Sequence, residues 1–222
     1  MGSDPNPVAA TRRDPNPVAA TRRIAVLISG RGSNLQALID AIAEGRLDAT
    51  LAAVISNRAD AQGLDRARAA GVDATVIDHR GFASRALFEE ALVKELRDRQ
   101  VSLVCLAGFM RLLGPTFLEA FPNAVLNIHP SLLPAFPGVD AQRQAWDHGT
   151  KVAGATVHLV TGELDGGPIV LQSCLPVLDD DTPDRLAARI LVEEHRIYPE
   201  AVRRLLDGGY EVQGRRFVKR GR

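Results

Sequence analysis

Residues 24–45 read IAVLISGRGSNLQALIDAIAEG, and this stretch decides the fold. Residues 24–29 form a short apolar run closed by Gly30, which predicts a buried strand. Residues 35–44 then place apolar side chains at helical spacing and stop at Gly45. A strand, a glycine turn and a helix in succession form the repeating unit of a parallel α/β sheet.

The same alternation continues along the chain. Further strands are predicted at residues 50–56, 74–77, 101–106, 124–128, 155–160 and 169–177, and helices at 61–70, 84–99, 115–120, 142–148 and 182–208. Residues 155–160 alternate as in a half-exposed strand, and residues 210–218 are typical of a terminal hairpin. The pattern predicts a single-domain, Rossmann-like α/β fold over residues 24–222, with a mostly parallel sheet and helices on both faces.

The first residues are set apart from this domain. Residues 4–13 read DPNPVAATRR, and residues 14–23 repeat them letter for letter. A tandem decapeptide with two Asn-Pro steps cannot stack as a solenoid repeat. We interpret residues 1–23 as a duplicated leader, either an artificial addition or a disordered segment, and exclude it from the fold.

Composition narrows the class of protein. The 27 Lys and Arg residues balance the 27 Asp and Glu residues, so net charge gives no general attraction to nucleic acid or membrane. Cys105 and Cys174 both lie in apolar runs, which predicts buried strand positions in a reduced compartment. No apolar stretch approaches the roughly 20 residues needed to span a bilayer. We therefore expect a cytoplasmic protein without nucleic-acid or membrane partners.

Candidate chemistry lies in residues 126–134, LNIHPSLLP. Asn127 and His129 are alternate residues at a strand end, so they should face one cleft beyond the carboxyl edge of the sheet. Two other interpretations remain open: both side chains satisfy local backbone groups, or His129 binds a metal with His158 and Asp165. The metal is less favoured because His158 belongs to an alternating strand, where a satisfied strand histidine is the simpler interpretation.

The glycine turn that follows the first strand begins like a dinucleotide fingerprint. Leu35 occupies the position of the third glycine, and Ser56 and Asn57 stand where an acidic residue would close the second strand, which argues against NAD. The turn suits one phosphate monoester at a helix N-terminus. It could equally be an ordinary turn capped by Ser33 or Asn34.

Two carboxylates complete the set of candidates. Asp165 lies beside Gly166 and Gly167, where it either caps its own backbone or reaches His129 and favours the imidazolium. Glu194 falls within the apolar stripe of the last helix. It either reaches solvent or faces the cleft and holds ligand hydroxyls or an amine.

Five motifs together resemble the phosphoribosylglycinamide formyltransferase family, folate-dependent enzymes of purine biosynthesis. They are ISGRGSNLQ at 28–36, AGFMR at 107–111, NIHPSLLP at 127–134, ELDGGP at 163–168 and EHRIYP at 194–199. Several motifs in register are more specific than any one of them. The resemblance covers the chain from residue 24 to about residue 209.

The resemblance implies transfer of a formyl group from 10-formyltetrahydrofolate, a co-substrate, to the amine of glycinamide ribonucleotide through a tetrahedral oxyanion, without a metal. Asn127, His129 and Asp165 match the family's catalytic positions. The positions that match its ribonucleotide contacts are Gly32, Ser33, Asn34, Leu191, Val192, Glu193 and Glu194. The positions that match its folate contacts are Arg85, Met110, Arg111, Leu112, Leu113, Asn127, Thr161, Gly162, Glu163, Leu164 and Asp165. A monomer or homodimer is expected.

One segment departs from the family pattern. After Pro137 and Gly138 the family shows a leucine or lysine and then His-Thr-His, whereas residues 139–142 read VDAQ. Asp140 therefore replaces a histidine, and either takes over its polar contact or adds negative charge near His129.

Two related enzymes share the formyl-handling module. Methionyl-tRNA formyltransferase would carry a further basic C-terminal domain and formyltetrahydrofolate deformylase an N-terminal regulatory domain, neither of which we expect here. A non-catalytic phosphate-ligand sensor on the same fold is the alternative of another class.

Overall fold

The computed structural model describes residues 21–220. The predicted leader lies outside these residues except for its last three. Strand β1 (Arg23–Ile28) begins one residue earlier than expected, and Arg23 already pairs with Thr50 of β2. Arg23, the last residue of the leader predicted over residues 1–23, is thus part of the sheet, whereas residues 1–20 lie outside the described residues and their assignment stays a prediction.

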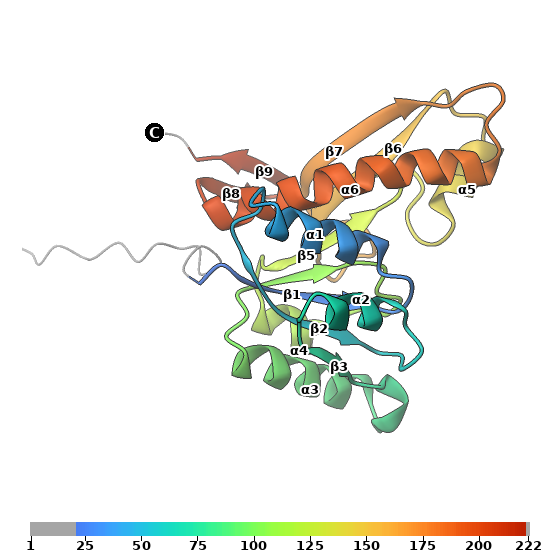
Figure 1. Cartoon of the computed structure of the whole chain (residues 1–222). Coiled ribbons are helices and arrows are strands. Elements are labelled where there is room, and N and C mark those ends of the chain that lie inside the picture. The colour runs from blue at the N-terminus through green and yellow to red at the C-terminus, as the bar shows by residue number, and fades with distance from the viewer. Residues whose placement is uncertain (1–20, 221–222) are drawn as a thin grey trace, which may run out of the picture.

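One nine-stranded sheet, with helices packed on it, accounts for the described residues (Figure 1). Its strand order is β3-β2-β1-β4-β5-β6-β7-β9-β8. The strands are β1, β2 (Thr50–Ser56), β3 (Ala74–Val76), β4 (Leu103–Leu106), β5 (Val125–His129), β6 (Val152–Leu159), β7 (Ile169–Pro176), β8 (Tyr210–Gln213) and β9 (Arg216–Lys219). The α-helices are α1 (Ser33–Ala43), α2 (Gly63–Ala69), α3 (Arg85–Asp98), α4 (Pro115–Ala120), α5 (Ala141–Asp147) and α6 (Pro183–Asp207), and a 3₁₀ turn, η2, spans His79–Gly81.

Strands β1 to β5 pair in parallel, and β6 pairs antiparallel with both neighbours. Right-handed crossovers place α1 and α2 on one face and α3 and α4 on the other. Helix α6 packs on α1 and crosses β5, β6 and β7. The expected mostly parallel α/β sheet covered on both faces is confirmed.

Two predictions about burial were wrong. Strand β6 was expected to be half-exposed, yet all its residues except Val152 are buried, because it lies between β5 and β7 and beneath α6. Cys105 is buried as expected, but Cys174 on β7 is exposed. Alternation along a strand cannot reveal that a neighbouring element covers its second face.

The strand order reverses between β1 and β4, which creates the crevice where α/β sheets bind ligands. The loops after these two strands are joined to one another. The Ser29 backbone N–H donates to the Gly108 carbonyl at 3.1 Å, and the Met110 N–H donates to the Ser29 hydroxyl at 2.8 Å. These bonds hold the carboxyl ends of β1 and β4 together, and β5 pairs in parallel with β4 beside them.

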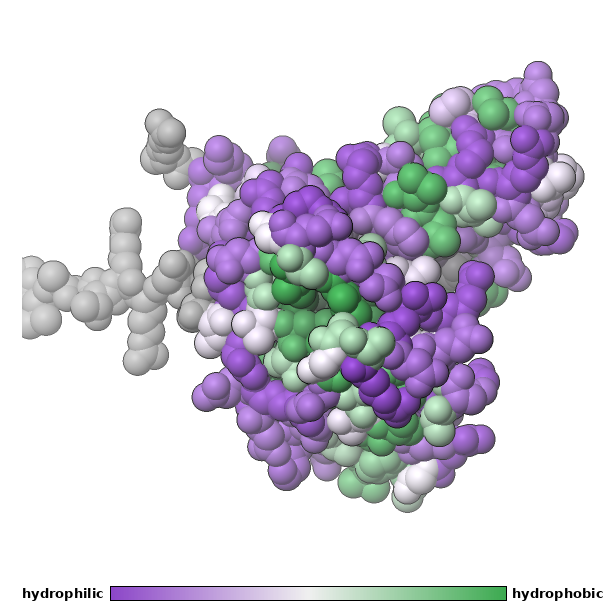
Figure 2. All heavy atoms as spheres, in the orientation of Figure 1, coloured by the Kyte–Doolittle hydropathy of each residue, from purple (hydrophilic) through white to green (hydrophobic). Residues whose placement is uncertain are grey.

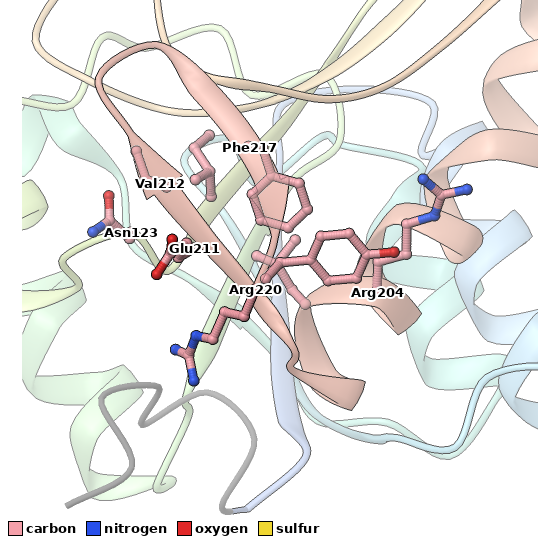
Figure 3. Close-up of a pocket in the computed structure, with 9 residues that line it drawn as sticks. Asn123, Arg204, Glu211, Val212, Phe217 and Arg220 are labelled. Carbon is pink, nitrogen blue, oxygen red and sulfur yellow. The ribbon is translucent and has the colours of Figure 1, made fainter. Parts of the chain in front are cut away.

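A hollow of about 260 Å³ lies at the other edge, against the terminal hairpin β8–β9 (Figure 3). Asn123, which precedes β5, lines it together with Arg204, Glu211 and Phe217. The rings of Phe217 and Tyr210 stack there with centroids 4.8 Å apart. Because this hollow adjoins the start of β5, it is remote from the crevice at the strand's end.

The surface is mixed in character. Figure 2 shows mainly polar side chains on this side of the molecule, with an apolar area in its middle, over α1 and α2. A shallow groove there is lined by Ile39, Ile42, Leu51 and Val72. Between residues 21 and 220 no helix is both long and apolar enough to cross a membrane.

Candidate active site

Strand β5 delivers the first two candidate residues. Asn127 is half-buried and His129 is only 5% exposed. Both lie at the end of a parallel strand flanked by β4 and β6, and their spacing of two places them on one side of the sheet. The predicted presentation of an amide and an imidazole at one edge is therefore observed.

His158 of β6 joins them directly. Its Nδ1 lies 3.1 Å from the Leu159 carbonyl and donates to it, and its Nε2 lies 3.1 Å from the Asn127 side-chain nitrogen. His158 is 2% exposed. Its Nδ1 is hydrogen-bonded within its own strand, as expected, but its contact with Asn127 was not predicted from the sequence. The antiparallel register that pairs the two residues was not readable from local pattern.

Asp165 closes the cluster from the loop between β6 and β7. Its Oδ2 lies 3.5 Å from His129 Nδ1, its Oδ1 lies 3.6 Å from His158 Nε2, and the Gly138 N–H donates to Oδ2 at 2.8 Å. Burial acts to raise the pKa of Asp165, but the contacts with His158, Gly138 and His129 outweigh it and hold the pKa below its ordinary value. Of the two interpretations of Asp165, the structure supports the one in which it reaches His129.

The proline-rich loop after β5 holds His129 from its other side. The His129 Nε2 lies 2.8 Å from the Phe136 carbonyl and donates to it. The Ser131 hydroxyl donates to the Ala135 carbonyl at 2.6 Å, and the Thr156 hydroxyl donates to the Ser131 carbonyl at 2.6 Å. Strand β6 thus fixes the loop that orients the imidazole ring.

A cavity of about 330 Å³ opens beside this cluster, and Asn127, His158 and Asp165 form part of its wall. Most of the predicted folate-contacting positions line it: Arg85, Arg111, Leu112, Leu113, Thr161, Gly162, Glu163 and Leu164. Met110 is absent from this lining, and its side chain is 70% exposed. The structure therefore brings three distant segments, the start of α3 and the loops after β4 and β6, to one cavity.

The glycine turn after β1 forms the start of α1. Gly32 is the N-cap in the left-handed region, at φ 70°, and no side chain caps the helix there, so the interpretation of a turn capped by Ser33 or Asn34 was wrong. A Cβ at Gly32 would lie 2.7 Å from the Gly63 Cα, and the Gly63 N–H donates to the Gly30 carbonyl at 3.0 Å. Gly63 at the start of α2 is thus a part of this turn that the sequence did not reveal.

Glu194 faces inward from α6. The Asn34 Nδ2 donates to its Oε2 at 2.6 Å, and both residues are buried. Burial raises the pKa of Glu194, and the Asn34 hydrogen bond partly opposes that effect. The solvent-facing alternative for Glu194 was therefore wrong. The Asn34 amide nitrogen is committed to Glu194, whereas its buried Oδ1 has no hydrogen-bond partner among residues 21–220, so this oxygen and the backbone N–H are left for a ligand.

The other residues of this α6 segment point in different directions. Leu191 lies one turn before Glu194 and shares its side of the helix. Val192 is 64% exposed. Glu193 turns toward β7, where it accepts a hydrogen bond from Ser173 at 2.5 Å and pairs with Arg196 at 2.7 Å. The predicted ribonucleotide contact of Glu193 thus competes with an existing ion pair.

The segment that departs from the family pattern lies at the start of α5. Asp140 is exposed and has φ 55°, and Gln142 is in the first turn of the helix.

Among residues 21–220, no group of three or more His, Cys, Asp or Glu side chains is placed to hold a metal ion. The metal interpretation of His129, His158 and Asp165 has no support in this geometry.

Comparison with models of known protein families identifies the family to which these site residues belong. A model described as "Formyl transferase" matches residues 22–202, which include every candidate residue. The chain belongs to the formyl transferase family. It is 46% identical over 185 residues to the phosphoribosylglycinamide formyltransferase of Escherichia coli strain K12, covering 83% of this chain and 87% of that protein.

Other proteins of the formyl transferase family are similar to this chain in sequence and in structure. The human trifunctional purine biosynthetic protein adenosine-3 is 45% identical over 190 residues, which are 86% of this chain and 19% of that much longer protein. The crystal structure of glycinamide ribonucleotide transformylase 1 from Symbiobacterium toebii superposes with a TM-score of 0.88 at 57% identity, covering 90% of this chain and 94% of that one. The family and its fold are thus both shown.

Proposed function

We propose that this formyl transferase transfers the formyl group of 10-formyltetrahydrofolate to the amine of glycinamide ribonucleotide. The observation that carries the proposal is the cluster of Asn127, His129, His158 and Asp165 beside the cavity that most of the predicted folate-contacting residues line. Relatives named for this reaction support it. The other formyl-folate enzymes are not favoured by these comparisons.

The turn at Gly32 would bind the phosphate of the ribonucleotide. Backbone N–H groups of Ser33 and Asn34 open α1, and an uncapped helix N-terminus favours an anion. Glu194, held by Asn34, would accept hydrogen bonds from ribose hydroxyls farther along the same ligand. These two contacts would present the amine to the cluster around Asn127.

The reaction needs a donor for the developing oxyanion. Attack of the amine on the formyl carbon converts its carbonyl oxygen into an oxyanion, which the Asn127 amide and the His129 imidazolium would stabilise. His129 faces an acceptor at each ring nitrogen, an arrangement that an imidazolium with two N–H donors satisfies. The 3.5 Å between its Nδ1 and Asp165 is longer than a strong hydrogen bond, so this proton stays available to the oxyanion.

Proton transfer would use Asp165. Its lowered pKa keeps it ionised near neutral pH, so it can hold His129 charged and orient a water molecule. That water would accept the proton from the attacking amine and deliver one to the departing folate nitrogen. Neither a covalent enzyme intermediate nor a metal is needed for these steps.

Calorimetric titration with each substrate separately tests the two halves of the site. Wild-type protein should bind both ligands, and His129→Ala should retain both while losing formyl transfer. A phosphate-ligand sensor would bind the ribonucleotide and transfer nothing even as wild type. Cytoplasmic location, absence of nucleic-acid partners and a monomeric or homodimeric state stay predictions.

A further inference from the structure

Glu89 is a buried carboxylate outside the cluster just described. It lies on α3 and is 1% exposed, whereas its neighbour Glu90 is exposed. A carboxylate is seldom buried unless charged or N–H groups hold it, because its desolvation is unfavourable. The partners of Glu89 therefore indicate what it does.

Its two oxygens bind the backbone at the start of α4. The Gly114 N–H donates to Oε1 at 2.7 Å, and the Phe117 N–H donates to Oε2 at 3.3 Å. Gly114 is the N-cap of α4 and offers no side chain for this purpose. Glu89 supplies from another helix the acceptors that the first turn of α4 lacks.

The same carboxylate contacts Arg85, one helical turn earlier. The Arg85 Nε lies 3.5 Å from Glu89 Oε1. A Cβ built on Gly114 would lie 2.8 Å from Arg85 Nη2 and 3.1 Å from Glu89 Oε1. The guanidinium and the carboxylate thus lie against the Gly114 backbone, and an added Cβ would push the exposed end of the Arg85 side chain aside.

This arrangement forms one wall of the cavity beside Asn127. Arg85, Leu112, Leu113 and Gly114 all line the cavity, whereas Glu89 does not. Glu89 lies behind the wall and joins its two halves, the guanidinium from α3 and the backbone that follows β4. Removal of its charge would release both halves, because each of them contacts the same carboxylate.

We infer that Glu89 is a positioning residue for the formyl-folate ligand, acting through Arg85 and the 112–114 segment without contacting the ligand itself. The inference rests on the proposed function for the identity of the ligand. Within residues 21–220 the hydrogen bonds and the ion pair of Glu89 reach Gly114, Phe117 and Arg85, and neither the cluster at Asn127 nor the turn at Gly32. Its effect should therefore be confined to one of the two substrates.

The test compares Glu89→Gln with Glu90→Gln, which makes the same change at an exposed neighbouring position. Glu89→Gln keeps the side-chain shape but has one carbonyl acceptor where the carboxylate has two oxygens. The Kd of 10-formyltetrahydrofolate, titrated without the amine substrate, should rise on the order of tenfold, and its KM likewise. The KM of the ribonucleotide and kcat at saturation should stay near wild type, and Glu90→Gln should change nothing.

Gly114→Ala provides a second approach with the carboxylate intact. Its Cβ would displace the Arg85 guanidinium, so it should weaken formyl-folate binding with the same selectivity. An unchanged Kd in both variants would overturn the inference. So would an equal loss of affinity for both substrates with a lowered unfolding temperature, since that indicates a merely structural role. Wild-type protein that binds 10-formyltetrahydrofolate but forms no product overturns the proposed function alone, and the Kd comparison still tests Glu89.

Discussion

Oδ2 of Asp165 lies 3.5 Å from Nδ1 of His129, while its Oδ1 lies 3.6 Å from Nε2 of His158. One carboxylate thus contacts two imidazoles that come from neighbouring antiparallel strands. Its backbone is held in the left-handed region at φ 50°, and the Gly138 N–H fixes Oδ2. Asp165 therefore connects the proline-rich loop, β5 and β6 at one point.

Asp165→Asn should lower kcat by about a hundredfold or more, because the amide cannot stabilise the charge of His129 or orient a basic water. The KM of either substrate should change far less. Steady-state kinetics with both substrates varied measures this, and Asp147→Asn is the control, since it removes an exposed carboxylate at the end of α5 to which no role is assigned. Equal kcat values for the two variants would exclude the assigned role.

Stability should also depend on Asp165 in acid. The pKa of this carboxyl is held below its ordinary value of 3.8, so its contribution is fully present above that value and is lost as pH falls through the folded pKa. Glu194 acts with the opposite sign, because its raised pKa removes stability as pH rises. The gap in unfolding midpoint between wild type and Asp165→Asn, which both retain Glu194, should shrink as the pH falls below 3.8. A gap that widens in acid would contradict the direction assigned to Asp165.

His158→Phe tests whether this residue positions Asn127. An aromatic ring is kept, but the ring nitrogen that lies 3.1 Å from the Asn127 amide is lost, and kcat should fall roughly tenfold. Asn127→Ala should lower kcat on the order of a hundredfold by removing an oxyanion donor. In a double-mutant cycle the His158 change should have little further effect once Asn127 is absent. Full additivity would show that the two residues act independently.

Thr156→Val should destabilise the loop that holds His129. The Thr156 hydroxyl donates to the Ser131 carbonyl and accepts from the Leu133 N–H at 3.0 Å and from Gln172 at 3.0 Å. Valine has nearly the same shape but leaves these groups unpaired, so the free energy of unfolding should fall by about 1–3 kcal/mol. Denaturant unfolding measures this, with Thr75→Val on the edge strand β3 as the control. A wild-type midpoint would refute the network.

Two effects of a substitution at Gly32, the clash of an added Cβ and the strain of its left-handed backbone, can be measured separately. Gly32 and Gly45 both have left-handed φ values, 70° and 72°, but only at Gly32 would a Cβ meet another residue, at 2.7 Å from Gly63. Alanine at either position should destabilise by about 1 kcal/mol through φ alone. Gly32→Ala should destabilise further and raise the KM of the ribonucleotide severalfold, whereas Gly45→Ala should leave that KM unchanged. Equal effects on the KM would contradict a phosphate site at the turn.

The sheet was predictable because its parallel strands are continuous apolar runs. β1 and β4 are buried on both faces, and Gly30 and Gly108, which come shortly after them, mark where the strands end. Asn127 and His129 were predictable for the same reason, since the end of a buried strand determines where its last side chains emerge. Local pattern was sufficient where the determining contacts are local.

Features that depend on long-range contacts could not be predicted from the sequence. The burial of β6 depends on α6, and the contact of His158 with Asn127 depends on an antiparallel register shared by strands far apart in sequence. Gly63 belongs to no periodic pattern or motif. Glu89 lies on the buried face of α3, but its partner Gly114 belongs to a distant segment that local pattern does not reveal. A single sequence carries no local signal for such partners.

Formyl transfer itself is the most direct measurement. Purified protein is mixed with glycinamide ribonucleotide and with 10-formyltetrahydrofolate carrying an isotopic label in its formyl carbon, and the products are resolved by mass spectrometry. The label should appear on the amine nitrogen of the ribonucleotide at a rate proportional to enzyme, and His129→Ala should abolish this while both ligands still bind. Folded wild-type protein that binds both substrates and leaves the label on folate, or releases it as free formate, would contradict the proposed reaction.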